Sequence, residues 1–420
     1  MDSSTAYRRG DLPRPSPEGL IRSGDDPIGC TRTSTSAVGP GAVAFRVMTP
    51  GKSAARSAPV RTTGSALGPD HPSHRLVDSP YLRACRGERP SRVPVWFQRQ
   101  AGRSLPEYRS LRREGSILDT IADPELSAEI TMQPVRRYGV DAAILYSDIV
   151  VPLQAIGFGV DVVPGVGPVI DRPFETEADL DRLRPVEPDV DLAHVEATVR
   201  ILVDELDVPL IGFAGAPFTL ASYLVEGRPS RTYGRTKALM LDNPGLWHRL
   251  MDRLADLSVA SIRSQVLAGA SALQLFDSWA GALSPRDYAE FVLPHSRRIF
   301  NELSPLGVPM AHFGVGTGEL LSMFAEAGAT VVGIDWRIPL DEARRRTGGQ
   351  VTLQGNLDPA VCLASWPTVA RRVRRILQDN DGHPGHVFNL GHGVLPETDP
   401  DILRRVVELV HQEGPASNGD

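Results

Sequence analysis

Eight short apolar runs alternate with longer helical patterns between about residue 78 and residue 412. The runs are Val93–Phe97, Ala142–Tyr146, Pro209–Phe213, Ala272–Phe276, Pro309–Phe313, Thr330–Ile334, Val351–Gln354 and Val387–Leu390. Their residues are apolar in succession rather than in alternation, as expected of parallel strands that are covered on both faces. Eight such strand–helix units in about 330 residues predict an α/β protein built as a single (β/α)8 TIM barrel.

Helix signals fall between these runs. Ser284-Pro285, Asp358-Pro359 and Asp399-Pro400 each have the pattern of an N-cap residue followed by proline at the first helical position. Residues 195–206 and 246–267 have apolar side chains at helical spacing, which predicts two amphipathic helices.

Residues 1–75 differ in composition from the rest of the chain. They are rich in Ser, Thr, Gly, Pro and Arg, show no helical or strand period, and have a net charge of +4 against −10 for the remainder. Such a segment cannot bury enough apolar surface to offset the entropy of ordering it. We therefore predict a disordered or dispensable extension over 1–75, a barrel over 78–412 and a short tail over 413–420. A transit peptide is the weaker alternative, because such peptides avoid acidic residues.

Composition excludes several classes of function. The net charge of −6 argues against a general nucleic-acid binder. Cys30, Cys85 and Cys362 are too scattered for a disulfide framework or a four-thiolate zinc site. The only lysines are Lys52 and Lys237, so imine chemistry is not expected. No apolar run reaches the roughly 18 residues that span a bilayer, and no signal peptide opens the chain, so we expect a cytoplasmic protein without a membrane partner.

Polar residues follow each apolar run. In chain order they include Arg99 and Arg103, then Asp148, Tyr223, Ser278, His312, Asp335, Asn356 and Asp358, and finally His392. In a (β/α)8 barrel the active site lies at the carboxyl ends of the strands, where these residues would meet. Their recurrence at this position is stronger evidence for a site than any one of them.

The arginines after the first run are the most informative of these residues. Arg99 and Arg103 flank Gly102, and guanidinium groups bind carboxylate or phosphate in a two-pronged fashion. Several of them beside a barrel mouth indicate a polyanionic ligand. The alternative is surface salt bridging to Glu107 and Glu114 nearby.

The other polar residues have two interpretations each. Asp148 directly follows an apolar run, so it either stabilises positive charge in a ligand or caps the next helix. Ser278 and His392 either contact a ligand or make structural hydrogen bonds, and Tyr223 either faces the site or belongs to the core. We assign Asp358 and Asp399 to capping.

Motifs for other chemistries are absent from the sequence. It contains no GxSxG nucleophile elbow, no phosphate-binding GK[ST] loop and no HExxH zinc motif. His71-x-x-His74 and His383-x-x-His386 offer only two ligands each, and we interpret both as structural. We therefore predict no metal site.

Six strings in this sequence resemble the uroporphyrinogen decarboxylase family. They are PVWFQRQAGRSLPEYR, ILYSDIVVPLQAIG, LIGFAGAPFTLASYLVEG, LFDSWAG, GNLDP and NLGHGVLPETDPD, in the family's order. The resemblance extends from about residue 78 to about residue 412. Ser104 stands where many members have tyrosine, and Gln98 where many have methionine. Neither departure replaces a charged group, so they bear on the packing of the loop more than on the activity.

The resemblance implies a cofactor-free barrel that forms a homodimer through its open ends. Members convert the four acetate side chains of uroporphyrinogen III, a tetrapyrrole, to methyl groups and yield coproporphyrinogen III in haem biosynthesis. By similarity, Arg99 and Arg103 bind substrate carboxylates and Arg99 is a candidate proton donor. Asp148 would accept the pyrrole N–H groups and stabilise a protonated pyrrole.

By the same resemblance, further residues belong to the substrate-binding set. They are Gln100, Ala101 and Gly102 in the arginine loop, and Tyr223, Ser278 and His392 elsewhere. The last three would bind propionate or acetate groups.

Two alternatives stay open from the sequence. A related barrel methyltransferase would bind zinc through a His-x-Cys pair after the fifth run, where this chain has His312-Phe313-Gly314. A non-catalytic porphyrin-binding protein would keep the arginines but would have no reason to keep Asp148.

Overall fold

A parallel β-sheet curls through the centre of the structure, a computed structural model that describes residues 66–111, 116–163 and 165–414. Its seven strands pair in the order β1-β4-β5-β6-β7-β8-β9, and every pairing is parallel. The strands are β1 Ala143–Ile144, β4 Leu210–Gly215, β5 Ala272–Phe276, β6 Met310–Phe313, β7 Val331–Gly333, β8 Thr352–Gln354 and β9 His386–Val387. Seven of the eight predicted runs therefore contribute strands to one parallel sheet.

The first predicted run is present only as a bridge. Val95 forms an isolated parallel bridge with Phe388, and the Phe388 N–H donates to Pro94 O at 2.8 Å. On the other side, the Asp141 N–H donates to Val95 O at 2.7 Å. The segment is thus hydrogen-bonded next to β9 on one side and to Asp141, shortly before β1, on the other, but its pairing is too short to count as a strand.

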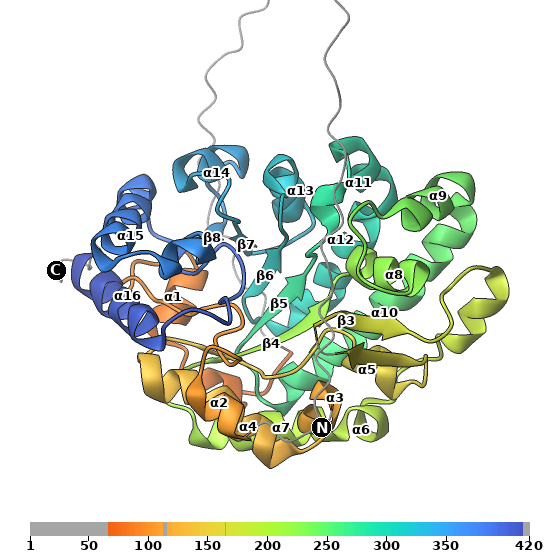
Figure 1. Cartoon of the computed structure of the whole chain (residues 1–420), viewed down its shortest axis with the longest axis horizontal. Coiled ribbons are helices and arrows are strands. Elements are labelled where there is room, and N and C mark those ends of the chain that lie inside the picture. The colour runs from red at the N-terminus through yellow and green to blue at the C-terminus, as the bar shows by residue number, and fades with distance from the viewer. Residues whose placement is uncertain (1–65, 112–115, 164, 415–420) are drawn as a thin grey trace, which may run out of the picture. The chain divides into compact units, whose positions relative to one another are not determined.

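The predicted pattern of buried strands is confirmed. All six residues of β4 are buried, as are all four of β6, so their side chains are covered on both faces. Helices surround the sheet, as Figure 1 shows. The longest, α10, packs against β4, α8 and α12.

The helices follow their start signals. They are α1 Pro80–Cys85, α2 Pro106–Leu111, α3 Ile117–Ile121, α4 Pro124–Tyr138, α5 Val151–Ala155, α6 Pro188–Asp191, α7 Ala193–Glu205, α8 Pro217–Glu226, α9 Gly234–Asp242, α10 Pro244–Ala268, α11 Pro285–Phe291, α12 Leu293–Leu303, α13 Leu321–Glu326, α14 Leu340–Arg346, α15 Trp366–Asn380 and α16 Pro400–Glu413. Short 3-10 helices are η1 Pro72–His74, η2 Glu177–Arg182, η3 Ala280–Ala282, η4 Ser304–Leu306, η5 Gly318–Leu320 and η6 Pro359–Leu363.

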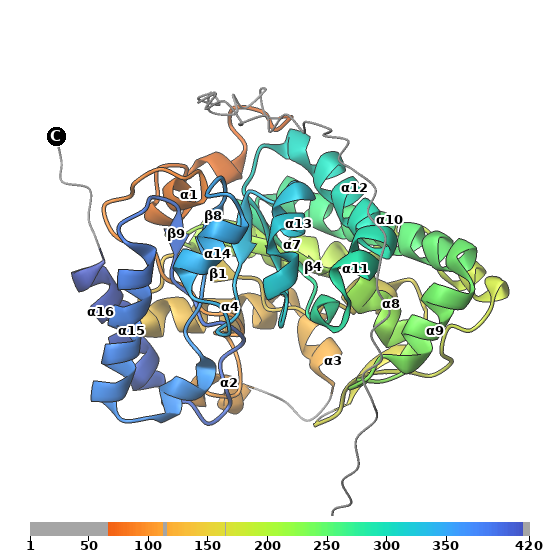
Figure 2. The same ribbon diagram turned by 90° about the horizontal axis from the view of Figure 1, so that it is seen from above.

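All three predicted caps are confirmed. Ser284 accepts the Asp287 N–H at the start of α11, and Asp399 accepts the Asp401 N–H at the start of α16. Asp358 accepts the Ala360 N–H, although it begins the 3-10 helix η6 rather than an α-helix. Figure 2 shows α15 and α16 side by side at one edge and α8, α9 and α10 at the other.

An antiparallel hairpin, β2 Val160–Val163 with β3 Gly167–Ile170, was not predicted. Its residues alternate between buried and more exposed positions, so it lacks the continuous apolar run by which the other strands were recognised. The hairpin contacts α3, α5 and α8 and is a sheet of its own, not hydrogen-bonded into the seven-stranded one.

The predicted disordered extension ends too late in the chain. Residues 66–75 pack on the domain, since Leu67 is buried and the Ala66 N–H donates to Pro305 O at 2.7 Å. Arg75 also donates to Leu206 O. These contacts are distant in sequence and leave no local period to detect. Residues 1–65 and 415–420, on which the rest of the extension and most of the predicted tail fall, lie outside the described residues.

Two of the three cysteines lie within the described residues. Cys85 and Cys362 are buried free thiols, and burial raises the pKa of each to about 12, so neither is a reactive thiolate. Cys30 lies outside the described residues. Within the described ranges, no helix combines the length and the apolar character needed to cross a bilayer.

Candidate active site

Arg99 lies in the loop after the Val95 bridge, with a backbone that few arginines adopt. Its φ of 56° is in the left-handed region. The side chain crosses Gly393 so closely that a Cβ there would lie 2.4 Å from Arg99 Cδ. Neither Arg99 nor Arg103 forms an ion pair with any residue that the structure describes, and both are exposed. Their charges are therefore free to meet an anionic ligand.

The alternative explanation for these arginines, surface salt bridging, is wrong for Glu107. That carboxylate pairs with Arg137, with 2.9 Å between Arg137 Nη1 and Glu107 Oε1. Glu114 lies outside the described residues. Arg109 instead donates to the backbone oxygens of Arg103 and Ser104 at 2.7 and 3.2 Å, which holds the arginine loop in shape.

Gln100 holds the same loop from inside. Its side chain is fully buried, its Oε1 accepts the Phe97 N–H at 3.0 Å, and its Nε2 donates to Ala142 O at 3.2 Å. The amide thus ties the loop to the start of β1. Ala101 and Gly102 are half-buried beside it. The predicted contact of these three residues with substrate stays a prediction. The side-chain amide of Gln100 already forms hydrogen bonds with backbone groups.

Asp148 lies between β1 and α5, and its predicted contact with a ligand stays a prediction. Its Oδ1 accepts the Val150 N–H at 3.1 Å, but Val150 rather than Asp148 is the N-cap of α5, so the predicted helix cap is not formed. Burial raises the pKa of Asp148, while the N–H groups of Val150 and Ile149 and the positive charge of Arg99 oppose that rise. The carboxylate is therefore partly desolvated and lies within the electrostatic field of Arg99.

Tyr223 on α8 completes this charged group. Burial raises its pKa, the negative charge of Asp148 adds to the rise, and the charge of Arg99 reduces it. The ring is half-buried and packs on Trp279, with 4.0 Å between the ring centroids. Tyr223 thus packs on Trp279 as well as on the core, and its contact with substrate stays a prediction.

His392 is a neutral hydrogen-bond donor. Burial, with the nearby positive charges of Arg99 and Arg337 and against the negative charge of Asp335, lowers its pKa to about 4. Its Nδ1 accepts the Gly393 N–H at 2.7 Å, so the ring proton is on Nε2. Within the described residues no acceptor meets that N–H, which leaves it available to a carboxylate.

Ser278 and His392 line one cavity of about 270 Å³. Its other lining residues are Tyr233, Trp279, Ala282 and Val315. The sequence reasoning missed Tyr233 and Trp279. Trp279 adjoins the predicted Ser278, but Tyr233 follows a helix rather than a strand, and no local pattern indicated it. Tyr233 has a left-handed backbone, φ 54°, and its ring centroid lies 5.2 Å from that of Trp279.

Asp335, which the sequence left undecided, has a structural role. It is buried, accepts the N–H groups of Gly316 and Arg337, and pairs with the Arg337 guanidinium. It therefore holds the loops after β6 and β7 together.

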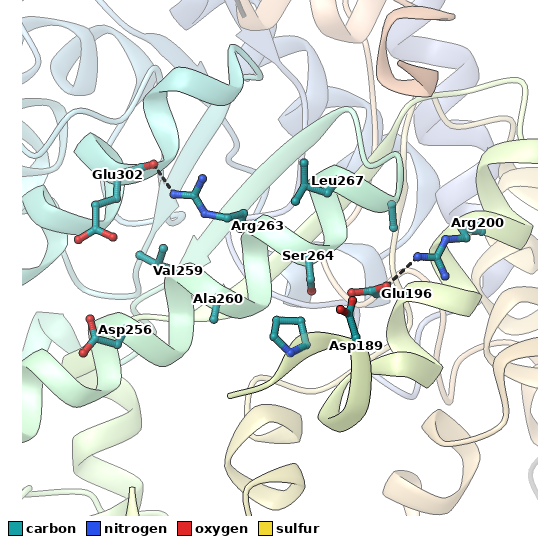
Figure 3. Close-up of a pocket in the computed structure, with 12 residues that line it drawn as sticks. Asp189, Glu196, Arg200, Asp256, Val259, Ala260, Arg263, Ser264, Leu267 and Glu302 are labelled. Carbon is teal, nitrogen blue, oxygen red and sulfur yellow. Dashed lines mark hydrogen bonds and ion pairs between the residues drawn. The ribbon is translucent and has the colours of Figure 1, made fainter. Parts of the chain in front are cut away.

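A larger cavity, of about 480 Å³, lies away from these residues, on the outer side between α7 and α10 (Figure 3). Its two arginines already have partners. Arg200 pairs with Glu196 at 2.7 Å, and Arg263 donates to Glu302 O at 2.8 Å. None of the predicted site residues lines it, so we do not assign the reaction to this cavity.

The candidate metal motifs are structural where the chain is described. His386 is buried and bonds Gly355 O, and His71 bonds Ser73 and Leu267 O. Within the described ranges, no three His, Cys, Asp or Glu side chains form a group that could hold a metal ion.

Comparison with known proteins adds independent information. The family model for uroporphyrinogen decarboxylase (URO-D) matches residues 77–413. The chain is 59% identical over 337 residues to a uroporphyrinogen decarboxylase of Salinispora tropica, covering 80% of this chain and 91% of that protein. It is 59% identical over 343 residues to one of Streptomyces coelicolor, covering 81% and 96%.

A solved structure supports the fold. A methyltransferase from Methanosarcina mazei superposes with a TM-score of 0.62 at 18% identity, covering 79% of this chain and 97% of that one. At this identity the likeness concerns the fold alone.

Proposed function

The chain belongs to the uroporphyrinogen decarboxylase family, and from that premise we propose how its site works. The protein is an enzyme of haem biosynthesis that removes CO2 from uroporphyrinogen. We propose further that its substrate is the III isomer, that all four acetates become methyl groups, and that the product is coproporphyrinogen III. The reaction in this proposal needs no cofactor.

One observation supports this proposal above the others. Asp148, Tyr223 and His392 come from three different parts of the chain, and the charge of Arg99 acts on all three. The substrate has eight carboxylates and four pyrrole N–H groups. A site for it needs positive charge and donors for the former and an anionic acceptor for the latter, and these residues supply both.

Each residue has a distinct proposed role. Arg99 and Arg103 bind substrate carboxylates through guanidinium groups that have no ion-pair partner among the described residues. His392 donates from Nε2 to an acetate or propionate, and the hydroxyls of Ser278 and Tyr223 donate in the same way. Asp148 accepts the pyrrole N–H groups.

The proposed chemistry balances without an electron carrier. A proton adds to the ring carbon next to the one that bears the acetate, and the pyrrole becomes a cation. The bond to the carboxylate carbon then breaks, CO2 leaves, and its electron pair neutralises the ring. A second proton adds to the exocyclic methylene carbon and the first proton leaves the ring carbon, so that the side chain becomes a methyl group and the pyrrole is restored. Asp148 stabilises the cation, an interaction that is strongest in the transition state, and Arg99 is the candidate proton donor.

The fold and assembly in this proposal go one step beyond the seven-stranded sheet. We assign residues 93–97 as the eighth strand, because they hydrogen-bond next to both β9 and β1, so that the sheet closes as a (β/α)8 barrel. A homodimer and a cytoplasmic location belong to the same proposal. Sedimentation of the purified protein tests the dimer.

An anaerobic incubation with uroporphyrinogen III tests the activity. After oxidation, chromatography counts the carboxylates of the products, and we expect a progressive loss from eight to four. Unchanged substrate from folded protein would contradict the proposal. Tight binding without CO2 release would favour a porphyrin-binding role, and stoichiometric zinc would favour the methyltransferase alternative.

A further inference from the structure

His312 and Asp277 form a buried pair behind the cavity wall. Both side chains are fully buried, and His312 Nε2 lies 3.6 Å from Asp277 Oδ2. In the sheet, His312 of β6 is in register with Leu275 of β5, so it points to the same face as Asp277. Phe300 of α12 and Phe324 of α13 pack on the His312 ring, which places the pair between the sheet and its helices.

The hydrogen-bonding capacity of this pair is unmet. Asp277 Oδ2 and both ring nitrogens of His312 are buried without a hydrogen-bond partner among the described residues. Tyr288 on α11 is the other titratable group that faces Asp277; its hydroxyl is also unpartnered, and burial together with the negative charge of Asp277 raises its pKa. A buried carboxylate without a counter-charge is strongly unfavourable, and His312 is the basic group beside it.

The other oxygen of Asp277 connects the pair to the cavity wall. Thr219 at the start of α8 donates its hydroxyl to Asp277 Oδ1 at 3.0 Å and accepts the Trp279 N–H at 3.3 Å. Ser278 and Trp279 directly follow Asp277 and line the cavity. A movement of the Asp277 carboxylate would therefore move both lining residues.

We propose that Asp277 and His312 form a buried ion pair, and that this pair positions the Ser278–Trp279 wall for substrate binding. The inference rests on the proposed function for its kinetic consequence. His312 and Asp277 are positioning residues: they lie behind the wall and do not touch the substrate. Because the wall contacts bound substrate before and during the reaction alike, its displacement raises KM more than it lowers kcat.

Two substitutions and their combination test the pair. His312→Phe keeps an aromatic ring on Phe324 and removes the charge, and we expect KM for uroporphyrinogen III to rise about tenfold with kcat within about threefold of the wild type. Asp277→Asn keeps an acceptor for Thr219. In the double variant no unpaired charge is left, so KM should return to within about threefold of the wild-type value.

His386→Phe is the matched control. It also removes a fully buried strand histidine, but one that bonds a backbone oxygen and faces no carboxylate. Its thermal midpoint should fall while KM stays unchanged. A KM within about twofold of wild type in His312→Phe, or single effects that multiply in the double variant, would overturn the proposal.

A measurement on the unsubstituted protein keeps the test decisive if His312→Phe does not fold. In ¹⁵N-histidine NMR at about pH 8, where exposed histidines are neutral, His312 should show protons on both ring nitrogens. A neutral His312 ring would overturn the proposal. This readout needs no turnover, so a protein that leaves uroporphyrinogen unchanged would contradict the proposed function while the NMR result still decides the pair.

Discussion

Replacement of Gly393 by alanine should displace the Arg99 side chain while leaving that residue itself unchanged, and so lower activity. Gly393 does not have a left-handed backbone, so alanine fits its φ. The added Cβ would lie 2.4 Å from Arg99 Cδ and 2.8 Å from Arg99 Cγ. Ordinary carbon contacts are about 3.5–4.0 Å, so the arginine side chain must move by roughly 1 Å. The left-handed backbone of Arg99 limits how the residue can adjust.

The expected loss follows from that displacement. A misplacement of about 1 Å at a reacting group costs about a hundredfold in rate, which is about 2.7 kcal/mol of transition-state stabilisation. Overpacking should also lower the free energy of unfolding of the variant by about 1–3 kcal/mol. Initial rates of coproporphyrinogen formation give kcat/KM, and thermal unfolding shows whether the variant is folded at the assay temperature.

Two controls isolate Arg99 as the cause. Gly245→Ala at the start of α10 places its Cβ 3.7 Å from Arg249 Nη1, an ordinary contact, and should leave kcat/KM unchanged. In an Arg99→Ala background, Gly393→Ala should cost less than about twofold more, because the two closest atoms, Arg99 Cδ and Cγ, are gone and only Arg99 Cβ stays at 3.1 Å. The reasoning is refuted if Gly393→Ala alone keeps kcat/KM within about threefold of wild type, or if it costs a further hundredfold in that background.

Three further predictions concern the same site. Asp148→Asn should lower kcat at least about a hundredfold by removing the charge opposite the pyrrole cation, whereas Asp358→Asn, a cap of η6, should leave kcat unchanged; equal losses would contradict the assignment. Because burial holds the pKa of His392 at about 4, the unfolded chain takes up this proton before the folded one as pH falls below about 6.5. The free energy of unfolding, measured with urea, should therefore decline towards pH 4. In His392→Gln this decline should be smaller by up to about 3 kcal/mol; the same decline in both proteins would exclude His392 as the cause. Trp279→Ala should raise KM about tenfold, since the rings of Tyr223 and Tyr233 lose their common support, while Trp279→Phe should restore most of the affinity; a variant with unchanged KM would show that the aromatic wall does not bind substrate.

Local sequence determined much of the framework. Continuous apolar runs mark strands because a parallel sheet buries both faces, and Asp-Pro or Ser-Pro marks helix starts because proline needs no N–H there. These are short-range rules, and at Ala272–Phe276 and Ser284-Pro285 the structure follows them to the residue. The arginine loop and Asp148 could be singled out from the sequence, because they follow predicted strands whose carboxyl ends carry the site in a (β/α)8 barrel.

What the tertiary structure alone decided depends on contacts between distant segments. The pKa shifts of His392 and Asp148 follow from burial and from Arg99, which the sequence places 293 and 49 positions away, respectively. Tyr233 reaches the cavity through a left-handed backbone after a helix, and residues 66–75 pack through contacts to Pro305 and Leu206. Local periodicity reports which face of an element is buried. It does not indicate which distant segment covers that face. The covering segment determines the pKa of each side chain in this site, its position, and whether its hydrogen-bond donor is left without a partner.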